Sequence, residues 1–426
     1  MRQELDLRAT GARTFRSLRI RNYRLFFTGQ LISVTGTWMQ TVAQSWLVLR
    51  LTNSGVALGI TVALQFLPML LFGMWGGLLA DRADKRRLLI AMQAAGALLA
   101  LVLYALVATA TVQLWMVWVL AFGLGMVTMV DMPTRQAFVI EMVGPDEVPN
   151  AVGLNSAMFN AGRILGPTAA GITIATLGLA PVFLANAFSF PPVIAGLMMM
   201  RPDELHRRTP PQRQKGDIRA GFLYAWHEPT LRSTLLLVGV LGMFGFNFIV
   251  VLPLMAKFTF DGGAGLYSVL TALMSVGSLA GALISASRSR PTTRMLVGAG
   301  VAFCALMIVT AAAPTAWFAG VVLVGVGMAM MLFMATANTM LQLNSDPAMR
   351  GRVMALYGLL FAGSTPVGGP LLGWISEVLG PRAGMGLGGV LSLAAALAAA
   401  SRIRVRRRPV PMAPADVHEA PDIAVA

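Results

Sequence analysis

The stretch that decides the fold runs from residue 56 to residue 87. Residues 56–79 read VALGITVALQFLPMLLFGMWGGLL, 24 residues without a charged side chain, and residues 80–87 read ADRADKRR. A helix needs about 20 mostly apolar residues to cross the hydrocarbon core of a bilayer. Lys and Arg beside such a helix are typical of the cytoplasmic side. This stretch therefore predicts a membrane-spanning helix that ends in a cytoplasmic loop.

The remaining chain repeats this alternation of long apolar runs and short polar loops. Hydrophobic residues make up 56% of the 426 residues and charged residues 12%, whereas a soluble domain carries about 25% charged residues. This composition excludes a soluble globular domain, and its hydrophobicity excludes a disordered chain. We therefore expect an all-α membrane protein with twelve transmembrane helices in two pseudo-symmetric six-helix bundles. The expected spans are residues 25–49, 56–79, 88–110, 114–137, 151–176, 180–200, 233–256, 264–287, 295–313, 316–341, 353–378 and 383–401.

The positive charges fall on one side of this arrangement. The net charge is +15, and 28 of the 33 Lys and Arg lie in segments that alternate spanning assigns to a single side. Because such residues accumulate in cytoplasmic loops, the surplus indicates topology and not a nucleic-acid interface. Both termini are expected in the cytoplasm, with the chain in the bacterial inner (cytoplasmic) membrane. The basic segments are residues 1–24, 81–87, 201–232, 288–294, 350–352 and 402–408.

The residues that metal sites, disulfide frameworks and ATP hydrolysis require are missing from the sequence. Cys304 is the single cysteine, which excludes a disulfide framework and a cysteine-rich metal site, and the three histidines lie in polar stretches. None of the three lysines, Lys85, Lys215 and Lys257, follows a glycine, so no P-loop for ATP hydrolysis exists. We therefore expect that the protein is not an enzyme and binds no cofactor or metal. The energy for its work must come from an ion or solute gradient or from a partner.

A long polar stretch divides the chain in two. Residues 201–232 are expected to form a cytoplasmic linker between an N-terminal bundle, residues 25–200, and a C-terminal bundle, residues 233–401. Residues 1–24 are expected to form a cytoplasmic N-terminal segment, and residues 402–426 a cytoplasmic disordered tail.

Glycines and Gly-Pro pairs recur at nearly the same offset in the two halves. Small residues four apart let helix backbones approach closely, and a Gly-Pro pair frees a carbonyl and bends a helix. The recurrence predicts the same packing joints in both halves, which suits a machine that rocks one half against the other. The expected packing and hinge residues are Gly73, Gly77, Gly162, Gly166 and Pro167 in the first half and Gly277, Gly281, Gly369 and Pro370 in the second.

One loop carries a family resemblance. The residues from Gly77 to Arg86, GLLADRADKR, resemble the signature between spans 2 and 3 of the major facilitator superfamily, with Asp84 where the family has a glycine. Asp tolerates tight-turn backbone better than most residues. The matching loop of the second half, Gly281 to Arg290, keeps the glycine and basic residues but has Ser285 in place of Asp.

The fifth span adds a second resemblance. Gly153, Gly162, Gly166-Pro167 and Ala170-Gly171 resemble the motif of the exporter and antiporter branches of the superfamily. The phrases at 29–40, 131–136 and 163–167 are similar to the transmembrane secretion effector branch, which includes siderophore exporters of the enterobactin type. The resemblance covers nearly all of residues 15–401 and implies export. Many proton-driven antiporters of the superfamily carry an arginine early in span 4, where residues 114–125 have no charge.

Arg163 is a candidate for substrate contact, because an ionisable side chain inside a span is costly. Ser156, Asn160 and Arg163 recur at i, i+4 and i+7, on one helix face. Arg163 is interpreted either as a cavity-facing cation that binds an anionic or polar substrate group or tunes a nearby carboxylate, or as a structural arginine hydrogen-bonded to neighbouring helix ends.

Asp131 and Arg135 are candidates for coupling or gating, one helical turn apart in span 4. Asp131 can take up and release a proton during the cycle. Alternatively it is a latch that pairs with Arg135, or with Arg86, and holds an inner gate shut. The family resemblance further implies that Asp81, next to Arg82 in the signature loop, caps a helix of the other half.

A polar stripe follows span 1, with steps of three and four residues that keep it on one face. It predicts either one wall of a central cavity that offers hydrogen bonds to a polar substrate, or hydrogen bonds to neighbouring helices. Asn247 in span 7 and Asn338 in span 10 are candidates for the other wall. The stripe consists of Gln30, Ser33, Thr37, Gln40 and Gln44.

Together these patterns favour a secondary active transporter. We expect it to export a small amphipathic molecule, siderophore-like or drug-like, by alternating access with proton antiport. The expected partners are a small-molecule substrate, the lipid bilayer and protons, and the chain is expected to be a monomer. The alternatives are a solute importer of the same fold and a membrane sensor that transports nothing.

Overall fold

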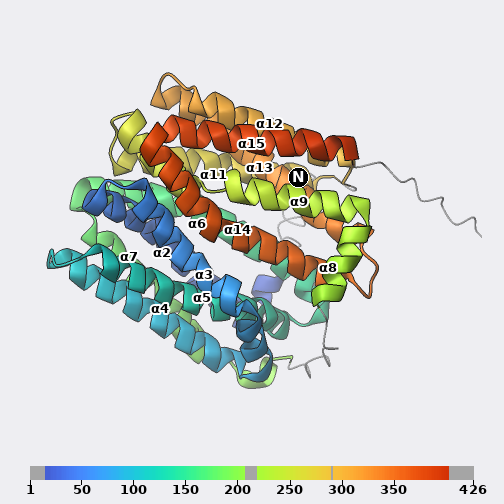
Figure 1. Ribbon diagram of the computed structural model, residues 1–426. Coiled ribbons are helices and arrows are strands. Elements are labelled where there is room, and N and C mark those ends of the chain that lie inside the picture. Colours follow the sequence, from blue (N-terminus) through green and yellow to red (C-terminus); the bar gives the residue numbers. More distant parts are fainter. Residues whose placement is uncertain (1–14, 207–217, 289–290, 403–426) are drawn as a thin grey trace, which may run out of the picture.

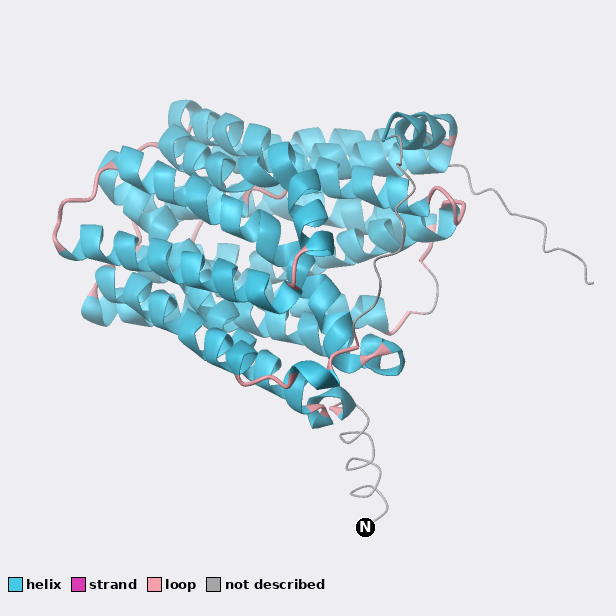
Figure 2. Cartoon of the chain, turned by 90° about the horizontal axis from the view of Figure 1, so that it is seen from below, coloured by secondary structure: helices cyan, strands magenta, loops and turns pink. Residues whose placement is uncertain are grey.

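The computed structural model describes residues 15–206, 218–288 and 291–402, and every regular element within these ranges is a helix (Figure 1). In Figure 2 the long helices run roughly alongside one another. The first half contains η1 (Arg16–Arg19), α2 (Arg21–Thr52), α3 (Gly55–Arg82), α4 (Lys85–Ala108), α5 (Leu114–Val143), η2 (Pro145–Glu147), α6 (Val148–Leu177) and α7 (Ala180–Met198). The second contains η3 (Pro202–Glu204), α8 (Ile218–His227), α9 (Pro229–Phe244), α10 (Phe248–Leu254), η4 (Met255–Thr259), α11 (Ala264–Ala286), α12 (Thr293–Ala311), α13 (Ala316–Asn344), α14 (Arg350–Leu379) and α15 (Pro381–Arg402).

Ten helical segments of the described ranges are long and apolar enough to cross a membrane. They are α3, α4, α5, α7, α11 to α15, and the segment Pro229–Thr259 that α9, α10 and η4 form together. α2 and α6 have 32 and 30 residues, so they have the length, but the polar residues noted above make them less apolar. An all-helical membrane protein is thus confirmed, while a count of twelve spans stays a prediction.

The helices extend beyond the apolar runs that predicted them. α5 continues to Val143 and α14 begins at Arg350. The expected linker contains a further helix, α8, and the seventh span begins at Pro229 instead of residue 233. Residues 207–217 of the linker, and most of the expected terminal segments 1–24 and 402–426, lie outside the described residues.

The helices of each half pack mainly on one another. In the first half α2 lies against α6 and α7, and α4 against α5 and α7; in the second, α9 lies against α14 and α15, and α12 against α13 and α15. The halves meet where α3 contacts α14 and α6 contacts α11. Figure 1 shows the two halves largely on opposite sides, blue to green against yellow to red. Whether they move as separate bundles stays a prediction.

Three glycines of the second half pack as tightly as their spacing suggests. Gly277 and Gly281 of α11 lie against the carbonyl oxygens of Val324 and Met328 on α13, so close that a Cβ atom would overlap them. Gly369 approaches Gly59 on α3, where a Cβ atom would lie 3.3 Å from the Gly59 oxygen.

The corresponding position in α3 differs from the expectation. A Cβ atom on Gly73 would meet only Met69 of its own helix, at 3.9 Å, and Gly77 is half-exposed. The close approach falls on Gly76, where a Cβ atom would lie 2.5 Å from the Met129 oxygen of α5. Gly73 and Gly277 are 204 residues apart, and this offset predicts a close helix contact at Gly73. The contact falls on Gly76 instead, because α3 is turned so that Gly76 faces α5.

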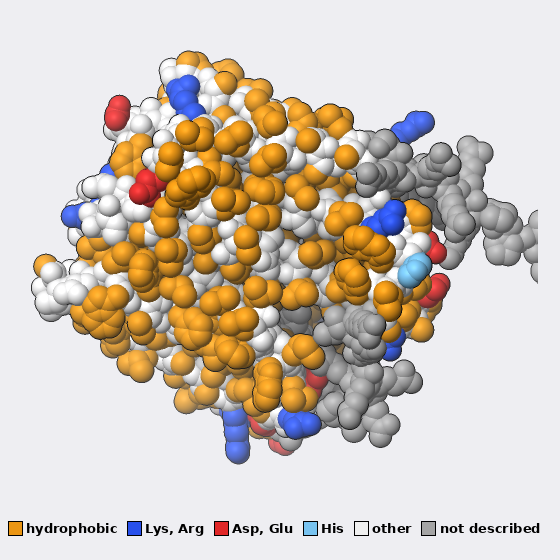
Figure 3. Space-filling model, in the orientation of Figure 1, with side chains coloured by type: hydrophobic (Ala, Val, Ile, Leu, Met, Phe, Trp, Pro, Cys, Tyr) orange, Lys and Arg blue, Asp and Glu red, His pale blue; other side chains and the backbone are white. Residues whose placement is uncertain are grey.

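The outside of the molecule is apolar. Trp317, Met74, Trp75 and Leu177 have exposed fractions of 70–80%, and hydrophobic side chains cover most of the face in Figure 3. A soluble protein rarely exposes contiguous apolar patches of this extent. Lipid tails are the solvent that suits this surface.

Candidate functional site

Arg163 lies on α6 where that helix packs tightly against α2. Gly162 contacts Val34 and Gly166 contacts Trp38, so the two backbones come close together. The Arg163 guanidinium consequently lies over the Trp38 ring, 5.2 Å from its centroid. Its Nε atom is buried without a hydrogen-bond partner, and no carboxylate pairs with it in the described part of the chain. A buried cation without a counter-charge is costly, which makes Arg163 suitable for an anionic or aromatic ligand group.

The other two residues of the expected α6 face bond within their own helix. Asn160 Nδ2 donates to the Ser156 carbonyl at 2.9 Å, and Ser156 Oγ donates to the Val152 carbonyl at 2.9 Å. No described hydrogen bond joins either residue to Arg163. Of the predicted trio, Arg163 therefore has the strongest structural case.

The polar stripe of α2 is mostly buried. Thr37 alone of its five residues is exposed, and its Oγ1 donates to the Ser33 carbonyl at 2.9 Å. Gln40 Oε1 accepts a hydrogen bond of 2.6 Å from Asn186 Nδ2 on α7, as the alternative of bonds to neighbouring helices requires. Gln30 Oε1 is buried without a partner. Ser33 and Gln44 are also buried, and Gln30 is the residue of the stripe whose buried side-chain oxygen lacks a partner.

Asp131 belongs to a buried three-residue network. Arg135 Nη2 forms a salt bridge with Asp131 Oδ2 at 2.7 Å, and Gln93 Nε2 of α4 donates to Asp131 Oδ1 at 2.8 Å. The Arg135 guanidinium lies 5.2 Å from the ring centroid of Phe159 on α6. The partner of Asp131 is thus Arg135 and not Arg86, and the network holds α4, α5 and α6 together inside the first half.

The signature loop is tied to its own half. Asp84 begins α4 as its N-cap, and its Oδ1 accepts from the Arg87 amide at 3.0 Å, which explains why aspartate replaces the family glycine. Lys85 pairs with Glu141 at 2.8 Å. Arg86 Nε donates to the Leu197 carbonyl at 2.6 Å. Asp81 is half-buried in the last turn of α3 and Arg82 is exposed at its end.

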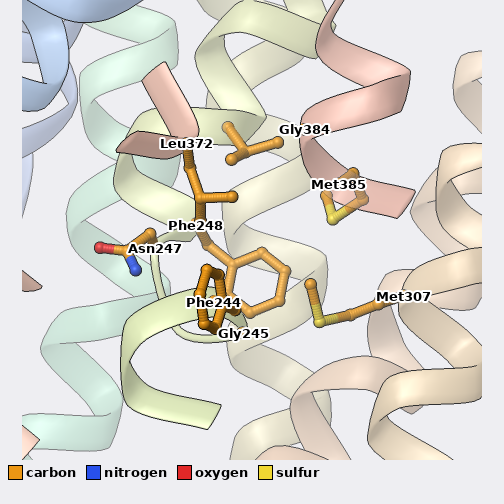
Figure 4. A pocket seen from close by; sticks show the side chains of 9 residues that line it. Phe244, Gly245, Asn247, Phe248, Met307, Leu372, Gly384 and Met385 are labelled. Atoms are coloured by element: carbon orange, nitrogen blue, oxygen red, sulfur yellow. The ribbon is translucent and has the colours of Figure 1, made fainter. Parts of the chain in front are cut away.

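The seventh span is broken in the middle. α9 ends at Phe244 and α10 begins at Phe248, and the Asn247 side chain lies at the break (Figure 4). Asn247 Nδ2 donates to the carbonyls of Gly242 and Met243, at 3.2 and 2.8 Å, which are groups that the interruption frees. Its Oδ1 is buried without a partner. Broken helices are found at the substrate sites of several transporters, so Asn247 is both a helix-break cap and a candidate ligand.

Asn338, the other expected residue of the second half, lies on α13 and is half-buried. Its Oδ1 accepts from Gln342 Nε2 of the same helix at 2.7 Å. This bond occupies Asn338, and no described contact brings it to Arg163 or Asn247.

Two opposite charges of the second half bind the α2–α3 turn of the first. Glu377 Oε2, on α14, accepts from Ser54 Oγ at 2.6 Å and from the Val56 amide at 3.0 Å, at the start of α3. Lys257 Nζ donates to the Leu49 carbonyl at 2.8 Å and to Asn53 at the end of α2. An acid at a helix start and a cation at a helix end both complement the helix dipole. We call these four hydrogen bonds the clamp, and the end of the molecule with turns 53–54, 260–263 and 380 the clamped end.

Glycine contacts lie beneath the clamp. A Cβ atom on Gly55 would lie 2.5 Å from the carbonyl oxygen of Gly373 on α14, and one on Gly59 would lie 2.5 Å from that of Gly369. Gly171 of α6 similarly meets Ser268 of α11, with a Cβ distance of 2.7 Å. Glycines are required here because any side chain would separate the halves.

Sequence reasoning missed the clamp and the helix break. Glu377 is the sole acid of α14 and Lys257 the sole lysine of the second half, so each was a detectable isolated charge. Their partners are more than 200 residues away, and two of the four partner groups are backbone atoms, which carry no sequence signal. The break lies in a run that is apolar on both sides.

Known proteins with similar sequences are exporters and other transporters. The chain is 28% identical over 371 residues to the multidrug efflux pump Tap of Mycolicibacterium fortuitum, covering 84% of this chain and 89% of the relative. It is 26% identical over 369 residues to the enterobactin exporter EntS of Escherichia coli O1:K1 / APEC, covering 84% and 86%. It is 25% identical over 270 residues to the staphyloferrin A transporter of Staphylococcus aureus (strain NCTC 8325 / PS 47), covering 61% and 66%.

Solved structures show the same fold at low identity. A bacterial homologue of the human lysosomal transporter Spinster, in an inward-facing and unoccupied conformation, matches with a TM-score of 0.69 and 14% identity, covering 89% of this chain and 96% of that chain. The nucleoside transporter NupG matches with a TM-score of 0.69 and 14% identity, covering 90% and 98%.

The family assignment follows from the whole chain. The transmembrane secretion effector family matches residues 12–426, nearly the full length. Its members are transporters and not enzymes, so this chain is a multi-span bacterial inner-membrane protein with a small-molecule substrate. The protein is therefore a secondary transporter that belongs to the transmembrane secretion effector family of the major facilitator superfamily.

Proposed function

We propose that this transporter exports a small amphipathic molecule, siderophore-like or drug-like, from the cytoplasm. Support comes from relatives named as an enterobactin exporter, a multidrug efflux pump and a staphyloferrin A transporter. The basic residues of segment 81–87, together with Arg288 and Arg294, lie at the end opposite the clamp, which we call the basic end, and by charge this end is cytoplasmic. Both termini lie on the cytoplasmic side in this scheme.

The observation that carries the mechanism is the one-sided contact between the halves. Four hydrogen bonds and the Gly59–Gly369 approach join them at the clamped end. Toward the basic end the glycines of α3 make no such contact with α14, because Gly73 meets only Met69 of its own helix and Gly76 meets Met129 of α5. Such an arrangement corresponds to a pathway closed at the outer face. Opening requires residues 25–200 and 233–401 to rock apart there and together at the basic end.

Substrate recognition centres on Arg163. Its guanidinium with Trp38 offers a cation and an aromatic face, and Gln30 offers an unpaired carbonyl oxygen. A molecule with anionic or polar groups on an apolar frame fits these groups. Asp131, with Arg135 and Gln93, is proposed to link substrate movement to proton antiport by releasing its salt bridge when it is protonated. The network also serves as a latch within the first half, and Asp131→Asn, described below, tests the proton role.

The test is efflux from proteoliposomes loaded with candidate siderophores and drugs, with and without a pH gradient. In vesicles whose lumen faces the basic end, substrate should leave the lumen. It should leave faster when the pH gradient is present. Asp131→Asn should keep the hydrogen bond to Gln93 and abolish the gradient dependence. Gradient-driven accumulation in the opposite sense would establish an importer. Binding without any transport would establish a sensor.

A further inference from the structure

An apolar groove lies between α8, α9 and α14 at the basic end of the second half. It encloses about 190 Å³ and is apolar except for one cation. Its walls are Leu235 and Leu236 of α9 and Leu356, Leu359 and Leu360 of α14, together with Phe222, Ala225, Trp226 and Arg232. No residue proposed for transport lines it.

The short helix α8 has the character of a helix at a membrane surface. It packs on α9 and α14 near the ends of both helices. Phe222, Leu223 and Trp226 have exposed fractions of 45–49%, and the Phe222 and Trp226 rings stack with centroids 5.4 Å apart. Tryptophan is enriched at the boundary between hydrocarbon and headgroups, and amphipathic helices lie in that plane. The groove therefore opens where phospholipids meet water.

Arg232 supplies a positive charge beside Trp226, which also lines the groove. Its guanidinium lies 5.7 Å from the Trp226 ring centroid, and no carboxylate pairs with it among the described residues. Arginine binds phosphate with charge-assisted hydrogen bonds, and basic pockets between transmembrane helices hold anionic lipid headgroups. A cation beside an apolar slot matches a molecule with an anionic head and a hydrocarbon tail.

We propose that this groove is a binding site for one anionic phospholipid. Part of an acyl chain fills the space between α9 and α14, the phosphate meets Arg232, and Trp226 covers the junction of head and tail. The charge complementarity favours an anionic lipid over a zwitterionic one, and the apolar walls favour a lipid over a free anion. The site is independent of the transported molecule and of the transport direction.

The charge is tested with the full-length protein in detergent, by native mass spectrometry after addition of phosphatidylglycerol or phosphatidylcholine. The unaltered protein should retain one phosphatidylglycerol at least fivefold better than phosphatidylcholine, and Arg232→Gln should lose that preference. Arg294→Gln, at an exposed arginine of α12 at the same end, is the matched control and should keep it. Equal retention of both lipids by the unaltered protein, or undiminished preference in Arg232→Gln, would overturn the proposal.

The groove is tested by filling it without touching the charge. Leu359 is a lining residue with an exposed fraction of 46%, so Leu359→Trp can enter the groove without disturbing the core. This variant should lose the retained phosphatidylglycerol although Arg232 is present. Leu283→Trp, at an exposed leucine of α11, should bind as the unaltered protein does. Retention in Leu359→Trp, or displacement of the lipid by inorganic phosphate alone, would reduce the site to a bare cation and contradict the proposal.

Discussion

The two ends of α3 face different surroundings, although both are apolar helix. Near Gly55 and Gly59 the helix touches α14 backbone to backbone, and Glu377 binds its first turn. Near Met74 and Trp75 the same helix is exposed. Small residues and charged caps thus determine where the halves join, since hydrophobicity does not distinguish the two ends. A transporter whose halves join at one end of a helix pair can exchange that contact for one at the other end during a cycle.

The largest effect is expected from preventing contact at the clamped end. In Gly59→Val the new side chain would overlap the Gly369 oxygen and Pro370, and overpacking of this kind costs about 1–3 kcal/mol. Transport should fall at least tenfold, and hydrogen exchange of residues 49–56 should accelerate. Gly358→Val, at a glycine of α14 with open space around it, carries the same substitution and should keep most activity. Equal loss in both variants would mean that the clamped-end contact is irrelevant.

Removing the Arg163 guanidinium, which lies between the clamped end and the basic end, should have the next largest effect. Arg163→Ala leaves Trp38 without its partner and removes the buried charge, so transport should fall about tenfold or more while expression persists. Arg163→Lys keeps the charge without the planar stacking and should be intermediate. Efflux assays on matched amounts of protein provide the measurement, with Arg294→Ala as control. Retained transport in Arg163→Ala would assign the residue to the scaffold.

The clamp itself should contribute a smaller, conformational effect. Glu377→Gln or Lys257→Met removes one charge from these largely solvent-exposed hydrogen bonds, an effect of about 0.2–1 kcal/mol. Hydrogen exchange in residues 49–56 should rise about fivefold in each variant. Asp261→Asn, an exposed residue of the neighbouring 260–263 turn, is the control. Unchanged exchange in both clamp variants would show that the glycine contacts hold this end alone.

The smallest effect is expected from substitutions in the part of α3 that lies toward the basic end. Gly76→Ala should lower the thermal unfolding temperature, because its Cβ would press on the Met129 oxygen. Gly73→Ala has space and should leave that temperature unchanged or raise it slightly, since alanine favours helix over glycine by about 1 kcal/mol. Thermal unfolding in detergent compares the two. A larger drop for Gly73→Ala would mean that another helix covers α3 there.

The sequence predicted the helical segments because their signal is local. An apolar run and its flanking charges determine where a helix such as α3 begins and ends, to within a few residues. The Asp131–Arg135 pair was similarly accessible, being one helical turn apart. The clamp was not, because Glu377 binds a backbone amide at the other end of the chain. The break at Asn247 depends on how α9 meets its neighbours, which residue types alone do not reveal.

The burial of Cys304 has a practical consequence. It is the only thiol of the chain and is fully buried between α12 and its neighbours. Thiol-reactive nitroxides should therefore attach only to cysteines introduced by mutation, without first removing a natural one. One such spin label at each half, placed in turn at either end, would report the opening and closing distances of an almost unaltered protein in a bilayer. Labelling of the unmutated chain under native conditions would show that Cys304 becomes accessible during the cycle.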